Sequence, residues 1–153
     1  MQVGDVVVRG KSEAWLTGAI VLREGTACRA AVFLASQASG HPAEAVVVLP
    51  GGEQRVAWVE RRDGHLPSAI VPDTLELAGD RLTRCSRIPV SIEAQGAAPE
   101  GLGETGTWTR YEAPSGAAAF VLAASSRILW VGGWLAEGEW TILAAGSATL
   151  REL

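Results

Sequence analysis

Residue types that carry chemistry are scarce in this chain of 153 residues, which has two cysteines, two histidines and one tyrosine. Cys28 and Cys85 are far apart and neither belongs to a CxxC pair, which excludes a metal-ligand or redox motif carried by one element. His41 and His65 stand in the turn-like phrases GHP and GHLP, and no GxSxG motif accompanies them. We therefore predict no metal site, no cofactor and no enzyme activity, with both cysteines as free thiols.

Long hydrophobic runs are also absent from the chain. The longest run, residues 117–124, is far shorter than the roughly 20 apolar residues that a membrane-spanning helix needs. The opening phrase, MQVGDVVVRG, carries Asp5 within its apolar stretch and has no basic start, unlike a secretory signal. We predict a cytoplasmic protein with no transmembrane segment.

Charge is spread thinly and is slightly acidic, with a formal net charge of −4. Nucleic-acid binding needs clustered positive charge, and the one arginine-rich phrase, RLTRCSR at residues 81–87, is typical of an ordinary solvated stretch. The 17 carboxylates are scattered and form no close pair in an apolar setting of the kind that acid–base catalysis uses. These patterns predict no nucleic-acid partner and do not favour an enzyme.

Glycine and short runs of β-branched residues dominate what is present, with 18 glycines in all. About eleven such runs are separated by turn signals, a spacing typical of an antiparallel barrel or sandwich. We predict an all-β fold of many short strands, in a single domain over residues 1–153 made of two interlocked halves, roughly 1–87 and 88–153. The final phrase, SATLREL at residues 147–153, predicts a short C-terminal helical turn.

One phrase occurs nearly twice, as AVVVLPGGEQRVAWV at residues 45–59 and as AAFVLAASSRILWV at residues 118–131. Each copy is an apolar run ending in Leu, a small or polar linker, and an Arg followed by apolar residues and a Trp-Val pair. This spacing is typical of two strands joined by a tight turn and suggests an internal pseudo-repeat of hairpins. If the copies are equivalent, Trp58 and Trp130 occupy corresponding buried positions.

Tryptophan is enriched, with six in the chain, and three of them fall in the phrase WVGGWLAEGEW. On an extended strand Trp130 and Trp134 share one face with Gly132 between them, which would leave room for a ligand ring against the backbone. Core packing is the simpler explanation of these indoles, and a surface for a ligand or a protein partner is the alternative. The candidate ligand or partner residues are Trp130, Trp134 and Trp140.

The order of these features resembles the bacterial domain-of-unknown-function family numbered 4178. The opening QVGDVV with Gly18 and IVL after it, and the hairpin VVLPGGEQRVAWVE, are similar to that family's first two phrases. The closing stretch from WTRYEA to WVGGWLA is similar to its ending, with Tyr111, Gly116, Gly133 and Leu135 in matching places. The resemblance covers nearly the whole chain. It implies a β-rich accessory or binding domain, and it assigns no catalytic or ligand-binding residue.

Two functions follow as hypotheses. The lack of a catalytic constellation, together with excess apolar and Trp residues on short strands, favours a non-catalytic accessory domain that works by contact with a protein partner or by self-association. The alternative is a small-molecule or glycan-binding module that uses Trp130, Trp134 or Trp140 as a stacking platform.

Overall fold

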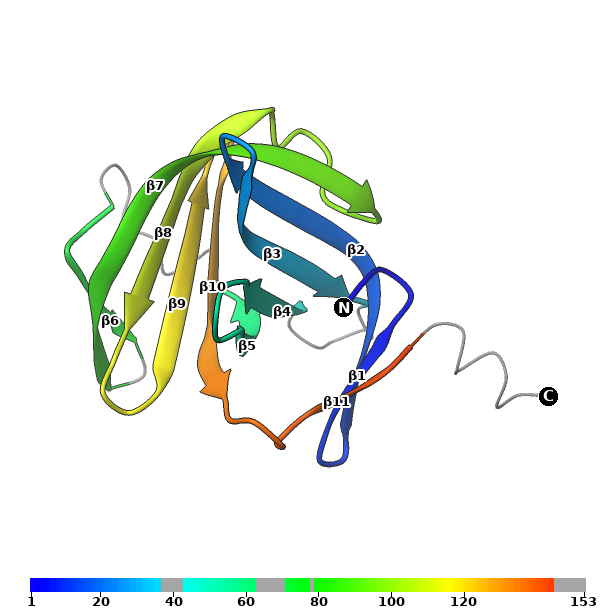
Figure 1. Cartoon of the computed structure of the whole chain (residues 1–153). Helices are drawn as coiled ribbons and strands as arrows, with labels where there is room; N and C mark the ends of the chain where they lie inside the picture. The colour runs from blue at the N-terminus through cyan, green and yellow to red at the C-terminus, as the bar shows by residue number, and fades with distance from the viewer. Residues whose placement is uncertain (37–42, 63–70, 78, 145–153) are drawn as a thin grey trace.

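Eleven strands make up the regular structure of the residues that the computed structural model describes, which are 1–36, 43–62, 71–77 and 79–144 (Figure 1). The all-β prediction is therefore confirmed. The predicted C-terminal helical turn at residues 147–153 lies outside the described residues. In chain order the strands are β1 (Val6–Arg9), β2 (Ser12–Glu24), β3 (Ala27–Ala35), β4 (Glu44–Leu49), β5 (Arg55–Arg61), β6 (Thr74–Leu77), β7 (Asp80–Gly96), β8 (Thr105–Glu112), β9 (Ala117–Ala123), β10 (Arg127–Leu135) and β11 (Thr141–Leu143).

Eight of these strands close into an antiparallel barrel, so the barrel alternative of the prediction holds. Two meanders, β2 to β5 and β7 to β10, are joined at two seams, where β5 pairs with β10 and β2 pairs with β7 (Figure 1). Strand β6 extends the sheet beyond β7, and β1 followed by β11 extends it beyond β2. The predicted boundary between two halves, near residue 87, falls inside β7.

The longest strand, β7, includes the arginine-rich phrase at residues 81–87, which the sequence predicts as a solvated stretch. It pairs with β8 over Thr83–Ser91, and on its other edge it pairs with β6 at Asp80–Thr83 and with β2 at Ser91–Gly96. Pro89 lies between those two pairings, on a stretch where the described residues place no strand beside the second edge of β7. Proline is tolerated there because its missing N–H would have no strand to bond.

Strand alternation divides the apolar side chains into an interior core and two outer layers. The interior core includes Phe120 and Trp130, and Leu102 from the loop between β7 and β8 packs into it. One outer layer lies between the wall of the barrel and the ribbon of β1 and β11, and the other lies under β6. The glycine-rich loop before β8 thus contributes to core packing.

Both seams depend on glycine, because strand backbones approach there more closely than a side chain allows. At the first seam, a Cβ at Gly132 would overlap the carbonyl oxygen of Trp58 on β5. At the second seam Gly18 pairs with Gly96, and a Cβ on Gly96 would lie 2.5 Å from the carbonyl oxygen of Thr17. The predicted use of Gly132, to leave room for a ligand ring, is therefore wrong, since the β5 backbone takes that space.

The repeated phrases do form two hairpins, β4–β5 and β9–β10, but their tryptophans are not equivalent. Leu49 and Leu122 both face the interior core. Trp58 comes nine residues after Leu49, whereas Trp130 comes eight residues after Leu122. Since successive strand residues point to opposite faces, this one-residue difference sends Trp58 into the outer layer and Trp130 into the interior. Both side chains are buried, as predicted, on opposite faces of the wall.

Substituting Gly132→Ala should destabilise the protein by about 3 kcal/mol or more, because the new methyl group forces β10 away from β5. Gly133→Ala, one residue along the same strand, is the matched control, since a Cβ there would lie 3.3 Å from the carbonyl oxygen of Gly116. Urea denaturation followed by tryptophan fluorescence measures both variants. Equal stabilities for the two variants would contradict this account of the seam.

Candidate functional site

Three charged side chains face into one mouth of the barrel and form what we term the mouth cluster: Arg55, Arg110 and Glu112. Arg110 and Glu112 lie directly opposite Phe120 and Ala118, and Arg55 lies opposite Leu49. Paired residues of an antiparallel ladder point to the same face, and all three partners belong to the interior core. The charges therefore point inward, at the end of the barrel where β4, β8 and β10 finish.

The cluster shares one carboxylate between two guanidinium groups. Arg55 donates from Nη2 to Oε1 of Glu112 at 2.5 Å. Arg110 Nε lies 3.7 Å from the other carboxylate oxygen, Oε2, which is close enough for an ion pair and too far for a hydrogen bond. The net charge of the cluster is therefore positive.

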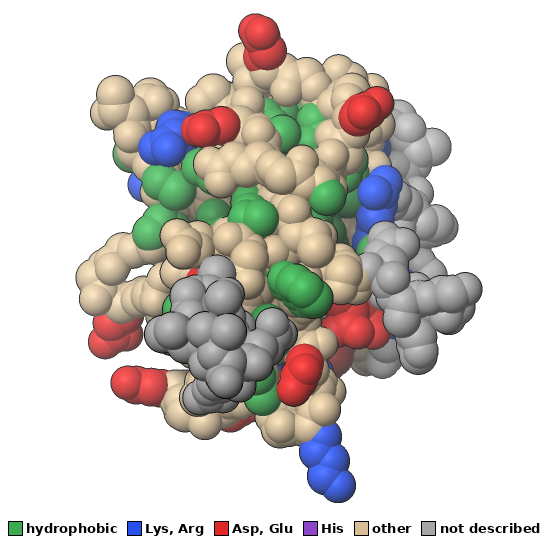
Figure 2. Space-filling model, turned by 90° about the vertical axis from the view of Figure 1, so that its right-hand side faces the viewer, with side chains coloured by type: hydrophobic (Ala, Val, Ile, Leu, Met, Phe, Trp, Pro, Cys, Tyr) green, Lys and Arg blue, Asp and Glu red, His purple; other side chains and the backbone are tan. Residues whose placement is uncertain are grey.

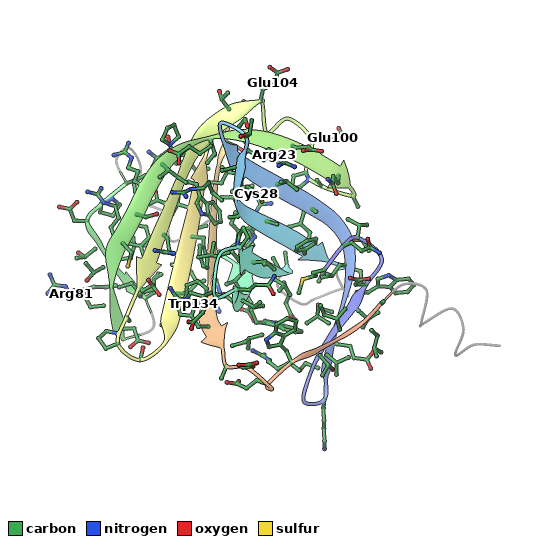
Figure 3. All side chains as sticks on the ribbon, in the orientation of Figure 1. Arg23, Cys28, Arg81, Glu100, Glu104 and Trp134 are labelled. Carbon is green, nitrogen blue, oxygen red and sulfur yellow. The ribbon has the colours of Figure 1, made fainter. Side chains whose placement is uncertain are left out.

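An aromatic ring holds Arg55 in place. Its guanidinium carbon lies 3.7 Å from the ring centroid of Trp134, a cation–π contact. The indole of Trp134 in turn meets Phe120 edge to face, with ring centroids 5.7 Å apart. Trp134, predicted as a binding residue, thus positions an arginine at the barrel mouth (Figure 3).

Electrostatics keeps Glu112 ionised. Partial burial acts to raise the pKa of this carboxyl, but the hydrogen bonds from Arg55 and Cys85 and the positive charges of Arg55 and Arg110 outweigh it, so the net pKa is lowered. The carboxylate is thus the negative centre that binds the two guanidinium groups of the cluster.

Two buried N–H donors in the barrel interior lack an acceptor. They are Nε of Arg110 and Nε1 of Trp134, each shielded from solvent and without a hydrogen-bond partner among the described residues. An unsatisfied buried donor costs about 1–3 kcal/mol, more when it is charged. Such donors are candidates for contacts with a ligand.

A cavity of about 260 Å³ opens beside the cluster. Its walls are apolar at Leu49, Ile88 and Trp108 and polar at Ser86 and Arg110. The described residues that line it include two arginines and no carboxylate. The full lining is Cys28, Arg29, Leu49, Pro50, Ser86, Ile88, Trp108 and Arg110.

Both thiols lie near this mouth. Cys85 occupies a bulge of β7, where the pairing with β8 shifts between Arg84 and Ser86. Burial and the hydrogen bond to Glu112 raise the pKa of the Cys85 thiol, which disfavours the thiolate. Cys28 is also free, and its thiol lies 3.7 Å from the carbonyl oxygen of Ala30.

The three predicted tryptophans do not share one surface. Trp130 is 2% exposed in the interior core and reaches a second cavity of about 260 Å³ at the opposite mouth of the barrel. Trp134 faces the interior at the mouth cluster. Trp140 packs on the outer layer beside β1 and β11, on the other side of the wall. A common stacking platform is therefore not assembled.

Trp140 lines a surface groove of about 610 Å³, which we term the acidic groove. Val56, Leu135 and Trp140 supply its apolar side chains, and Glu53 and Glu137 supply its charges. Both carboxylates are exposed. The groove is lined by these five residues together with Gln54 and Gly138.

A further indole is exposed on another face. Trp15 is 61% exposed, and among the described residues it is the large hydrophobic side chain that stands in solvent. It pairs across the ladder with Val6, which pairs with Leu143, so the three side chains share the outward face of β2, β1 and β11. Figure 2 shows this side of the molecule, where apolar side chains reach the surface in several places.

The residues of the mouth cluster are absent from the predicted site. A signal for two of them is present in the sequence, because the phrase TWTRYEA places Trp108, Arg110 and Glu112 on one face of a strand. Alternation alone does not say which face is inside. Arg55 gives no such signal, because its partners Glu112 and Trp134 come from distant strands.

Comparison with known proteins yields no match: no family model, no curated protein and no solved structure matches the chain. The resemblance to family 4178 therefore stays a prediction. No helix in the described ranges is long and apolar enough to cross a membrane. Within those same ranges no group of three His, Cys, Asp or Glu side chains could hold a metal ion, and His41 and His65 lie outside them.

Glu112→Gln should lower the free energy of unfolding at neutral pH by about 1–3 kcal/mol, because a charged hydrogen bond is lost. The pKa of Glu112 is depressed in the folded protein, so its contribution is present above its ordinary value of 4.5 and is lost as pH falls through the folded value. The difference between wild type and variant should therefore shrink in acid.

Urea denaturation over a pH series measures this difference. Glu104→Gln, on the loop before β8 (Figure 3), is the control for removing one negative charge elsewhere. If the difference in unfolding free energy between wild type and Glu112→Gln stays constant down to acid pH, the assigned role of the carboxylate is contradicted.

Proposed function

We propose that this protein is a non-catalytic domain that works by protein contact and that its partner docks in the acidic groove. The observation that supports this most is the groove itself, with the indole of Trp140 beside two exposed carboxylates, Glu53 and Glu137. Tryptophan is the side chain most often found at the energetic centre of protein interfaces, and a charged rim around it steers and orients the partner.

The chemistry of the groove selects the kind of partner. Its apolar part suits an aliphatic or aromatic anchor, and Glu53 with Glu137 suits lysine or arginine on either side of that anchor. The net charge of −4 over the chain favours approach of a basic segment in the same way. We propose a basic peptide segment with an apolar anchor as the occupant.

The same proposal includes a role without catalysis and a cytoplasmic location. The raised pKa of the Cys85 thiol supports a role without catalysis, and two free cysteines are compatible with a reducing compartment such as the cytoplasm. The resemblance to family 4178, which implies an accessory or binding domain, agrees with this proposal. A second copy of the chain, meeting the row of exposed Trp15 and half-buried Val6 and Leu143, is the self-association form of the proposal.

Peptides of equal length test the groove, with one set placing lysines around a central tryptophan and a matched set placing glutamates there. The lysine set should bind preferentially, with an affinity that falls as salt rises. Trp140→Ala should weaken binding at least about tenfold, by loss of the central contact. The double variant Glu53→Gln, Glu137→Gln leaves the apolar part intact and should remove the preference for lysine. Isothermal titration calorimetry measures each affinity.

Trp15→Ala is the matched control, because it removes an indole on a different face and should leave peptide binding unchanged. Equal binding of the two peptide sets, or equal losses in Trp15→Ala and Trp140→Ala, would contradict the groove as the docking site. Light scattering on wild type and Trp15→Ala separates self-association from the peptide contact.

A further inference from the structure

We propose that the cavity at the barrel mouth, beside Arg110, binds a small organic anion that carries an aromatic or branched apolar group. This site is independent of the acidic groove, since the two share no lining residue. None of the three predicted tryptophans lines this cavity.

The charge of the cavity favours an anion. Its two ionisable arginines are Arg29, which pairs with Glu24 at 3.4 Å, and Arg110. Glu112 is the carboxylate nearest to Arg110, but it accepts its short hydrogen bond from Arg55 and lies 3.7 Å from Arg110 Nε. Arg110 is thus a cation at the edge of a cavity, and Glu112 neutralises its charge only in part.

The donors available point to the same class of ligand. Nε of Arg110 is buried and has no hydrogen-bond acceptor among the described residues, while the side chain as a whole is 26% exposed. Ser86 lies directly opposite Arg110 on β7 and adds a hydroxyl to the lining. The guanidinium of Arg110, whose ion pair with Glu112 is 3.7 Å long, and the neighbouring hydroxyl suit a carboxylate, which accepts through two oxygens.

The inner wall of the cavity supplies the apolar side chains that would contact the uncharged part of the ligand. Ile88 and Trp108 lie opposite each other on β7 and β8 and point into the barrel, with Leu49 nearby. Trp108 stacks on Phe120 with centroids 5.3 Å apart and planes 16° apart, so the indole is rigid before a ligand arrives. A preformed apolar wall orients a ligand whose charged end meets Arg110.

The volume limits the ligand to a small one. About 260 Å³ lies just below the range of roughly 300–1,000 Å³ that is typical of pockets for drug-sized ligands. A single ring or branched chain with one carboxylate fits this size, whereas an oligosaccharide does not.

The mouth cluster sets the affinity of the site. Trp134 holds Arg55, and Arg55 holds Glu112 by its closest hydrogen bond, which keeps the carboxylate from neutralising Arg110 fully. An incoming anion therefore competes with Glu112 for Arg110. Removing the charge of Glu112 should strengthen anion binding, while the same change weakens the fold, as derived above.

Benzoate is the probe, and benzamide, which has nearly the same shape without the charge, is its matched control. Titration calorimetry on the full chain should show benzoate binding, with benzamide weaker by at least about tenfold. Shifts of the indole N–H signal of Trp108 in a nitrogen-proton correlation spectrum locate the ligand. Inorganic phosphate, run alongside, should bind more weakly than benzoate, because it has no apolar group.

Two variants are expected to change the benzoate affinity in opposite directions, so a general loss of stability cannot explain both results. Arg110→Met should reduce benzoate affinity at least about tenfold, whereas Glu112→Gln should raise it about threefold or more. Arg81→Met removes an exposed arginine on β7 that points away from the barrel (Figure 3) and should change nothing. Thermal unfolding shows that each variant is folded at the temperature of the titration.

Several results would overturn the proposal. They are equal affinity for benzoate and benzamide, benzoate binding that survives Arg110→Met, weaker binding in Glu112→Gln, or no binding of benzoate at millimolar concentration. Phosphate binding as tight as benzoate binding would overturn the apolar half of the site. None of these results bears on the acidic groove, whose test uses different residues.

Discussion

The closing of the barrel depends on close contact between strand backbones at two seams. Two meanders meet where β5 pairs with β10 and where β2 pairs with β7, and glycine occupies both contacts, as Gly132 and as the pair Gly18 and Gly96. A side chain at these places would separate the strands and open the ladder. The interior core and the mouth cluster both exist because the seams hold.

An eight-stranded barrel has an interior that side chains nearly fill, so space for a ligand remains at the mouths. Phe120, Trp108 and Trp130 occupy the middle with their rings in contact. At one mouth the interior ends in charges, where Arg55 stacks on Trp134 and shares Glu112 with Arg110. Trp134, one of the indoles that look like a binding platform in the sequence, thus supports an arginine instead.

Most of the architecture can be predicted from alternation and turn signals. The strands of the repeated phrases and of the phrase TWTRYEA are where the pattern places them, because local alternation reports which residues share a face. The site is less accessible to such reasoning. Arg55 and Glu112 are far apart in the chain, and their contact depends on the β5–β10 and β8–β9 pairings together.

The sequence by itself determined the all-β class, the hairpins and the faces that side chains share along each strand, since these depend on neighbours in the chain. Tertiary structure decided which of those faces is inside. Trp58 and Trp130 end similar phrases, yet one residue of difference in spacing places them on opposite sides of the wall. Barrel closure decided the site, because only the pairing of distant strands brings a second arginine to the carboxylate of Glu112 and leaves Arg110 beside a cavity.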